Sequence, residues 1–269
     1  MRKKNNIIVG LTTFDNEMLR VSVPMLGKIR QKFTLVIYND NPMTTITRRQ
    51  IRRLGYCGDL RVINTNENMG LFRARMEIVN AAHDLDAGWI IFCDDDDLLM
   101  DIEIPNVSDD NFAIIQNALI LHHRVGDLLR AMNNPSEIDV DGENVELARP
   151  YVAMAGTPVR ADILFGVAHM DSGFYDAIKK LDDKLEFVPP VDAMMWRFVN
   201  AYAHHMNANC APIYMDKIGY IKNKLDTVRM KYGRLTRPAR NVDEHYRRVL
   251  DKYDAIFRDA LATAAALRG

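Results

Sequence analysis

The sequence predicts an α/β fold in which a mostly parallel central sheet is flanked by helices. In the first 100 of its 269 residues, short apolar runs that suit buried strands alternate with segments of helical periodicity. This alternation is typical of parallel strands joined by helical crossovers, as in Rossmann-like sheets. A second observation concerns the site: four consecutive aspartates, Asp94 to Asp97, directly follow one of the apolar runs. Ligands of open α/β sheets bind beyond the carboxyl ends of the strands, which is where this row falls.

Four buried strands are predicted in this first half, each from an apolar run too short for a helix. They are Ile7–Leu11, Phe33–Tyr38, Leu60–Ile63 and Trp89–Cys93. Helical periodicity predicts three intervening helices, over residues 18–30, 46–54 and 71–83. Pro24 lies inside the first of these, and because proline has no N–H to donate, it predicts a kink or two short helices.

The composition is that of an ordinary globular protein, with 48% apolar and 26% charged residues. The net charge of −1 does not steer the molecule toward nucleic acid or an anionic membrane, so neither is expected as a partner. The three cysteines have no metal-type spacing and fit a reducing compartment. No window approaches the roughly 18 apolar residues of a membrane helix, and the apolar run after Met1 is too short for a secretory leader. We therefore expect a cytoplasmic protein without a transmembrane segment.

The four aspartates of residues 94–97, here called the tetrad, predict the metal end of a nucleotide site. Adjacent carboxylates repel one another, and a divalent cation would offset that repulsion; Mg²⁺ and Mn²⁺ both prefer such oxygen ligands. The polar ends of the first two strands, with Thr12 to Asp15 and Asp40, are expected at the same edge of the sheet. Neither G-x-G-x-x-G nor G-x-x-x-x-G-K-[ST] occurs, which excludes the dinucleotide fingerprint and the P-loop. The alternative is an acidic, solvated turn.

Arg75 is predicted to point inward, because it lies four residues after Leu71 on the apolar stripe of the helix at 71–83. An inward arginine is costly unless it meets an anion. Two partners remain open: one of the tetrad aspartates, in a structural ion pair, or a phosphate of a ligand.

Two linked motifs resemble GT-A glycosyltransferases of the family-2 type. Residues 66–75, Asn-Glu-Asn-Met-Gly-Leu-Phe-Arg-Ala-Arg, are followed about a dozen residues later by Trp89-Ile-Ile-Phe-Cys-Asp-Asp-Asp-Asp-Leu98. In that family an N-x-G-x-x-x-A-R segment precedes a strand that ends in D-x-D-D. The resemblance covers about the first hundred residues. Thr12-Thr13 replace the usual proline after the first strand, and residues 39–42, Asn-Asp-Asn-Pro, replace the usual D-D-G-S.

The resemblance implies a UDP-sugar site that holds Mn²⁺ or Mg²⁺. It assigns the nucleotide contacts to the ends of the first, second and fourth strands and to the inward arginine. These residues are Thr12, Thr13, Phe14 and Asp40 for the uridine, Arg75 for the base or diphosphate, and Asp95 for the ribose. Asp94 and Asp96 form the D-x-D of the family and would bind the metal, with Asp96 as the direct ligand.

The second half is expected to supply the acceptor side of the same domain. Residues 1–100 would be the nucleotide-binding half, 101–241 the acceptor and catalytic half, and 242–269 a C-terminal amphipathic helix. Residues 189–199, Pro-Pro-Val-Asp-Ala-Met-Met-Trp-Arg-Phe-Val, resemble the E-D-x-D-L-W-x-R region, in which Asp192 would deprotonate the acceptor hydroxyl. The alternative is a helix N-cap, and the family's preceding Glu is Val191 here.

Three further features of the second half leave alternatives open. His204 and His205 are expected as surface histidines rather than a third metal ligand, since adjacent helical residues diverge by about 100°. The basic stretch 217–240 would be a loop that closes over a diphosphate, a patch for an anionic partner, or a solvated face. The helix at 242–269 would pack on the domain or on a second copy, as a homodimer.

These features together predict a metal-dependent, inverting glycosyltransferase that moves a sugar from a UDP-sugar to a hydroxyl of a sugar, lipid-linked glycan or protein acceptor. A first alternative is a nucleotide-sugar-binding protein without transferase turnover. A second is a nucleotidyltransferase, although that class needs a Gly-rich basic loop after its first strand, and residues 10–15 contain none.

Overall fold

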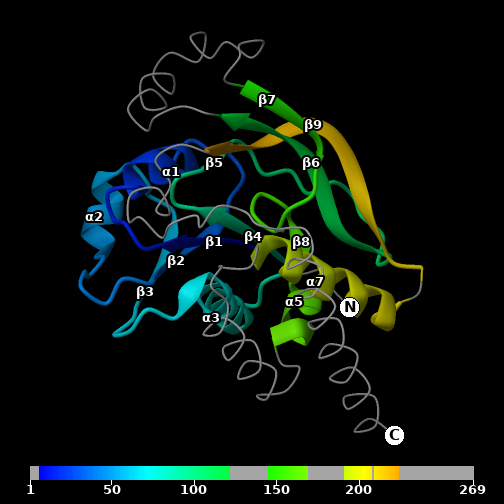
Figure 1. Cartoon of the computed structure of the whole chain (residues 1–269), viewed down its shortest axis with the longest axis horizontal. Coiled ribbons are helices and arrows are strands. Elements are labelled where there is room, and N and C mark those ends of the chain that lie inside the picture. The colour runs from blue at the N-terminus through cyan, green and yellow to red at the C-terminus, as the bar shows by residue number, and fades with distance from the viewer. Residues whose placement is uncertain (1–5, 122–144, 169–190, 208, 224–269) are drawn as a thin grey trace, which may run out of the picture.

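A computed structural model describes residues 6–121, 145–168, 191–207 and 209–223 of the chain. Within these residues the strands form one curved sheet with helices on both of its faces (Figure 1). The strand order is β3-β2-β1-β4-β8-β6-β9-β5, and β7 pairs with β6 beside this path. The predicted α/β class with a mostly parallel sheet is confirmed.

The first half of the sheet is entirely parallel. It consists of β1 (Ile7–Thr13), β2 (Thr34–Asn39), β3 (Asp59–Asn64) and β4 (Trp89–Asp94). All four were predicted, with ends that differ by at most two residues. The register pairs Thr12 with Asp94 and Thr13 with Asn39, so the carboxyl ends of β1, β2 and β4 lie side by side.

Three helices connect these strands, as predicted: α1 (Leu19–Leu26), α2 (Arg48–Arg53) and α3 (Gly70–Asp84). The helix predicted over 18–30 is shorter in the structure, where α1 ends at Leu26. Pro24 lies inside α1 and has no N–H to donate to the helical ladder. Thr47 caps α2 by accepting a hydrogen bond from the N–H of Gln50, whose side chain accepts one from the N–H of Thr47.

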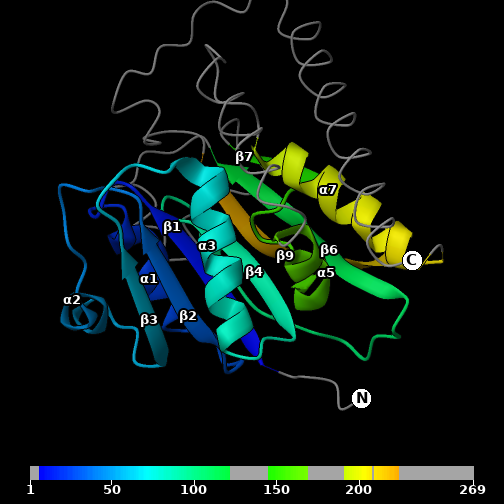
Figure 2. The ribbon, with the colours of Figure 1, turned by 90° about the horizontal axis from the view of Figure 1, so that it is seen from below.

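The parallel strands are buried on both faces, which explains their continuous apolar runs. Along β1, Ile8 packs on the side of α3, whereas Ile7 and Val9 pack on the side of α1. Figure 2 shows α3, α5 (Ala161–Ala168) and α7 (Val191–Met206) together on one face of the sheet. The two hydrophobic cores on either side of the sheet hold its carboxyl edge in place.

The second half of the sheet is mixed. Two long strands, β6 (Asn111–Leu121) and β9 (Ala211–Asn223), run parallel to each other. Three shorter strands pair antiparallel with their neighbours: β5 (Leu98–Leu99), β7 (Val145–Tyr151) and β8 (Val159–Arg160). The apolar residues of 112–122 predict a strand, which β6 confirms, whereas β9 was not predicted.

The interpretation of residues 217–240 as one basic loop was wrong at its start, because residues 217–223 belong to β9. Several other predictions concern parts of the chain outside the described ranges: the remainder of the basic stretch, the C-terminal helix at 242–269, and the side chains of Asp192 and His205. The proposed division of the domain into halves stays a prediction. No helix among the described residues is long and apolar enough to cross a membrane.

Candidate active site

The tetrad forms the turn that leaves the carboxyl end of β4. Asp94 is the last residue of the strand, and its carbonyl accepts a 3.2 Å hydrogen bond from the N–H of Asp97. Asp95, Asp96 and Asp97 are buried, at 5%, 9% and 1% exposure. The alternative of a solvated acidic turn was therefore wrong, and each buried carboxylate needs a compensating partner.

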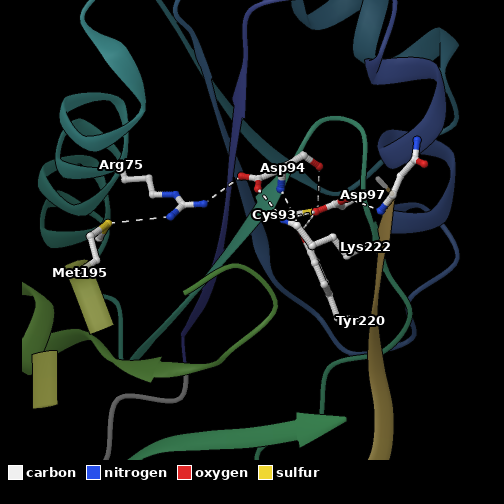
Figure 3. Close-up of polar contacts among 8 residues, drawn as sticks. Arg75, Cys93, Asp94, Asp97, Met195, Tyr220 and Lys222 are labelled. Carbon is white, nitrogen blue, oxygen red and sulfur yellow. Dashed lines mark hydrogen bonds and ion pairs between the residues drawn. The ribbon is translucent and has the colours of Figure 1, made fainter. Parts of the chain in front are cut away.

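Asp94 is held by Arg75 of α3. The guanidinium donates a 2.9 Å hydrogen bond from Nη2 to Oδ1 of Asp94, and Arg75 is 0% exposed (Figure 3). The same guanidinium lies 5.3 Å from the ring centre of Phe92, and its Nη1 lies 3.9 Å from Sδ of Met195 on α7. The predicted inward direction of Arg75 is confirmed. Of the two partners left open by the sequence, a tetrad aspartate or a ligand phosphate, the structure shows the aspartate, Asp94. A contact of Arg75 with a nucleotide stays a prediction.

Asp95 ties the end of β4 to the end of β1. The hydroxyl of Thr13 donates a 2.6 Å hydrogen bond to Oδ2 of Asp95. Burial is the largest cause that raises the pKa of Asp95 to about 7, with the charges of Asp94 and Asp15 acting in the same direction and the Thr13 hydrogen bond opposing them. Thr13 and Asp95, both predicted nucleotide contacts, are thus brought together.

Asp97 fastens the tetrad to the end of β9. Tyr220 donates a 2.8 Å hydrogen bond from its hydroxyl to Oδ2 of Asp97, and the backbone N–H of Asn223 donates one of 2.7 Å to Oδ1. Burial raises the pKa of Asp97 to about 7, opposed first by the positive charge of Lys222. β9 reaches this position because Leu98 and Leu99, directly after the tetrad, pair with Ile221 and Tyr220.

Lys222 places a second cation beside the tetrad. Its Nζ lies 3.6 Å from Oδ2 of Asp97 and 3.9 Å from Oδ2 of Asp94. Figure 3 shows Arg75 on one side of Asp94 and Lys222 on the other. Sequence reasoning missed Tyr220 and Asn223, and it included Lys222 only as a member of the basic stretch 217–240. The signal that could have found this strand is the short run of Ile218, Tyr220 and Ile221, since β-branched and aromatic residues favour strands.

Asp96 is the member of the tetrad whose carboxylate has no hydrogen bond or ion pair with any residue that the structure describes. Burial and then the charges of Asp97, Asp95 and Asp94 raise its pKa well above the usual range. Among the residues that the structure describes, Arg75 and Lys222 are the cations that face these four carboxylates, so within this part of the chain negative charge is in excess when the aspartates are ionised. Such oxygen donors suit Mg²⁺ or Mn²⁺.

No three His, Cys, Asp or Glu side chains converge as a ready-made metal site in the described part of the chain. The tetrad carboxylates still suit a metal, because Mg²⁺ is commonly bound through one or two carboxylates together with water and phosphate oxygens of a substrate. The residues therefore fit a metal that is bound jointly with a diphosphate rather than by the protein alone.

The predicted base-side residues lie next to the tetrad, at the ends of β1 and β2. Asp40 accepts hydrogen bonds from the backbone N–H groups of Met69 (2.7 Å) and Gly70 (2.9 Å), where α3 begins. Burial raises the pKa of Asp40, and these two hydrogen bonds oppose the rise. Asn41, which was not predicted, donates a 2.9 Å hydrogen bond to the carbonyl of Phe14 and so joins the two strand ends.

Asp192 is the second residue of α7. Met195, on the same helix, contacts Arg75, whereas the side chain of Asp192 lies outside the described part of the chain. His204, near the other end of α7, is exposed and its ring lies 6.5 Å from that of Phe112, as expected for a surface histidine.

The family model described as glycosyl transferase family 2 matches residues 19–109, from α1 to the loop before β6. No curated protein matches the chain.

Several solved structures match the chain at low sequence identity. TarS from S. aureus in complex with UDP is 14% identical, with a TM-score of 0.46, over 81% of this chain and 60% of that one. Over a longer TarS chain the covered share is 36%. The mannosyltransferase PcManGT from Pyrobaculum calidifontis, in complex with GDP-Man and Mn²⁺, is 10% identical, with a TM-score of 0.43, over 80% of this chain and 56% of that one. The chain thus spans less than two thirds of the length of these structures. Residues 19–109 are thus similar to glycosyl transferase family 2, and the chain has a mixed α/β fold with a mostly parallel sheet, as its motifs predicted.

Proposed function

We propose that this protein is a glycosyltransferase that moves a sugar from a nucleotide diphosphate sugar, a UDP-sugar, to an acceptor hydroxyl. The observation that carries the proposal is the buried tetrad at the carboxyl edge of β4, inside the segment matched by the family model. Asp94, Asp95 and Asp97 each accept a side-chain hydrogen bond from a described residue, whereas the carboxylate of Asp96 accepts none from the described residues and feels only the positive charge of Lys222. A carboxylate left in this state beside three others is suited to a cation.

Asp96 and the remaining oxygen of Asp94 are the groups that would hold Mn²⁺ or Mg²⁺. Such an ion, when bound, neutralises charge on the diphosphate leaving group. The protein contributes the geometry: Arg75 fixes Oδ1 of Asp94, and the Thr13–Asp95 and Tyr220–Asp97 hydrogen bonds hold the turn on either side of Asp96. Preorganised ligands of this kind cost little reorganisation when the donor binds.

The nucleoside would lie along the adjoining strand ends. Thr12, Thr13, Phe14 and Asp40 are neighbours at this edge, and the N–H of Asp40 donates a 2.8 Å hydrogen bond to the carbonyl of Thr13. A uridine placed there would put its diphosphate toward the tetrad, as expected for ligands beyond the carboxyl ends of parallel strands.

Asp192 would act as the general base for the acceptor. It would take the proton of the acceptor hydroxyl while that oxygen forms a bond to the anomeric carbon and the bond from this carbon to the diphosphate oxygen breaks. Attack on the face opposite the leaving group inverts the configuration. The contact of Met195 on α7 with Arg75 on α3 supports this role, because it holds the helix that begins at Val191 and Asp192 against the helix beside the tetrad.

A nucleotide-sugar-binding protein without turnover is the second candidate. It is favoured by Val191, which stands where the resembling motif has a carboxylate. The two candidates share the nucleotide site and differ only in transfer.

The test is calorimetric titration with UDP and with GDP, each with Mn²⁺ and with a chelator, on the wild type, Asp96→Ala and Asp59→Ala. Asp59 is an exposed carboxylate at the amino end of β3, at the far edge of the sheet, and is the matched control. We expect Mn²⁺-dependent UDP binding that is lost in Asp96→Ala and kept in Asp59→Ala. Absence of binding of either nucleotide by the wild type would overturn the proposal, and binding without transfer to any acceptor would favour the second candidate.

A further inference from the structure

Lys222 comes to the tetrad from a distant part of the chain and is fixed there on both sides. Its neighbour Asn223 donates its backbone N–H to Asp97, and Tyr220, two residues earlier on β9, donates its hydroxyl to the same carboxylate. Tyr220 is itself buried and stacks on Tyr151, with ring centres 5.9 Å apart. The backbone at Lys222 is thus anchored, while its side chain extends along the tetrad.

The two cations that contact the tetrad differ in their access to a ligand. Arg75 is completely buried, whereas the side chain of Lys222 keeps 29% of its surface exposed. The Nζ distances of 3.6 Å to Asp97 and 3.9 Å to Asp94 exceed the roughly 2.7–2.9 Å of a direct charge-assisted hydrogen bond. Lys222 therefore lies between the carboxylates and the solvent side, where an anionic ligand would approach.

We propose that Lys222 has two alternating partners: the carboxylates of Asp94 and Asp97 in the ligand-free protein, and the diphosphate in the nucleotide-bound protein. This rests on the proposed function, since it assigns a further contact to the same site. In the ligand-free state the ammonium partly neutralises Asp94 and so competes with a divalent cation for it. When the nucleotide binds, the ammonium contacts a phosphate oxygen and Asp94 regains its full charge for the metal.

This dual role makes an unusual prediction for the removal of one charge. Without the ammonium, Mn²⁺ alone should bind more tightly, because its competitor for Asp94 is gone. UDP in the presence of Mn²⁺ should bind more weakly, because one phosphate contact is lost. A lysine that only supports the structure would not shift the two affinities in opposite directions.

The experiment uses Lys222→Met, Lys222→Arg and the control Lys217→Met. Lys217 lies on the same strand, but its ammonium pairs with Asp101 and Glu103 rather than with the tetrad. Mn²⁺ is titrated into each protein without nucleotide, and UDP is titrated at saturating Mn²⁺; melting curves verify that each variant is folded.

For Lys222→Met we expect UDP affinity to fall about tenfold or more, the effect of one charge-assisted hydrogen bond, and Mn²⁺ affinity to rise several-fold. Lys222→Arg should keep most of the UDP affinity, and Lys217→Met should match the wild type in both titrations. The proposal is overturned if both affinities of Lys222→Met fall together or if neither changes. If the wild type itself binds no UDP or GDP, the proposed function fails first, and that outcome is distinct from a wild type that binds UDP and a Lys222→Met variant that binds it equally well.

Discussion

Arg75 donates a 2.9 Å hydrogen bond from Nη2 to Oδ1 of Asp94, and this pair joins α3 to the end of β4. The arginine has no exposed surface, while the aspartate is 20% exposed and opens toward the rest of the tetrad. The same guanidinium also contacts Met195 on α7. The pair therefore connects the carboxyl edge of the sheet with the helix that carries Asp192. Its removal should affect stability and the site together.

Arg75→Ala should lower the free energy of unfolding by about 3–5 kcal/mol, because it leaves Asp94 without its buried partner. The matched control is Arg61→Ala, which breaks a 3.1 Å ion pair with Asp84 whose side chains are 41% and 62% exposed. Such a surface pair is worth about 0–1 kcal/mol. Urea denaturation measures both. Equal losses of unfolding free energy in the two variants would show that the buried Arg75–Asp94 pair stabilises the protein no more than the surface pair does.

Asp97→Ala and Asp96→Ala should separate the structural and ligand-binding parts of the tetrad. Loss of Asp97 leaves two buried donors, the Tyr220 hydroxyl and the Asn223 N–H, without their acceptor, at about 1–3 kcal/mol each. Loss of Asp96 should leave the stability of the metal-free protein unchanged or higher, because burial and three neighbouring charges disfavour its ionised form. Thermal or urea unfolding in chelator measures this difference. A destabilised Asp96→Ala together with a stable Asp97→Ala would contradict the assignment.

Gly156→Ala should destabilise the protein more than Gly70→Ala. Both glycines have positive φ, at +80° and +78°, so alanine costs about 1–2 kcal/mol at either position. A Cβ at Gly70 would meet nothing within 4 Å, whereas at Gly156 it would lie 2.5 Å from Cγ of Tyr220. Overpacking there should add about 1–3 kcal/mol and displace the tyrosine from Asp97. Denaturation curves of the two variants provide the comparison, and equal costs would mean that the ring moves away freely.

Asp192→Asn should lower kcat by about 10²–10⁴-fold if the carboxylate is the general base. The affinity for UDP with Mn²⁺ should not change, because the substitution leaves the proposed nucleotide contacts at the ends of β1, β2 and β4 intact. Asp162→Asn is the control: Asp162 lies in the first turn of α5, and its 60% exposed side chain pairs with Arg160. It should keep the wild-type kcat. If Asp192→Asn loses only stability and transfers sugar at the normal rate, Asp192 is a helix-terminal carboxylate and not the base.

The local part of the site could be predicted because its signals are local. The apolar run of Trp89–Cys93 and the aspartates that follow it define a buried strand with its carboxyl end, wherever the strand lies in the sheet. The inward direction of Arg75 followed from its spacing of four residues from Leu71, and the structure confirms it with 0% exposure. The parallel pairing of β1, β2 and β4 followed from the crossover helices between them.

The partners of the tetrad could not be predicted in the same way. Whether Arg75 meets an aspartate or a ligand was left open, because periodicity gives the direction of a side chain and not what lies opposite it. Tyr220 and Asn223 are 123 and 126 positions from Asp97, and their hydrogen bonds exist only because β9 pairs with β5 directly after the tetrad.

The sequence by itself determined the α/β class, the four parallel strands and the position of the carboxylates at the end of β4. Apolar periodicity and crossover length act over a few neighbouring residues and are therefore readable along the chain. Which of these carboxylates have hydrogen-bond partners among the described residues followed only from the three-dimensional arrangement. That outcome depends on the pairing of β9 and the packing of α3 against α7, which bring Lys222, Tyr220 and Arg75 to the tetrad from three separate parts of the chain.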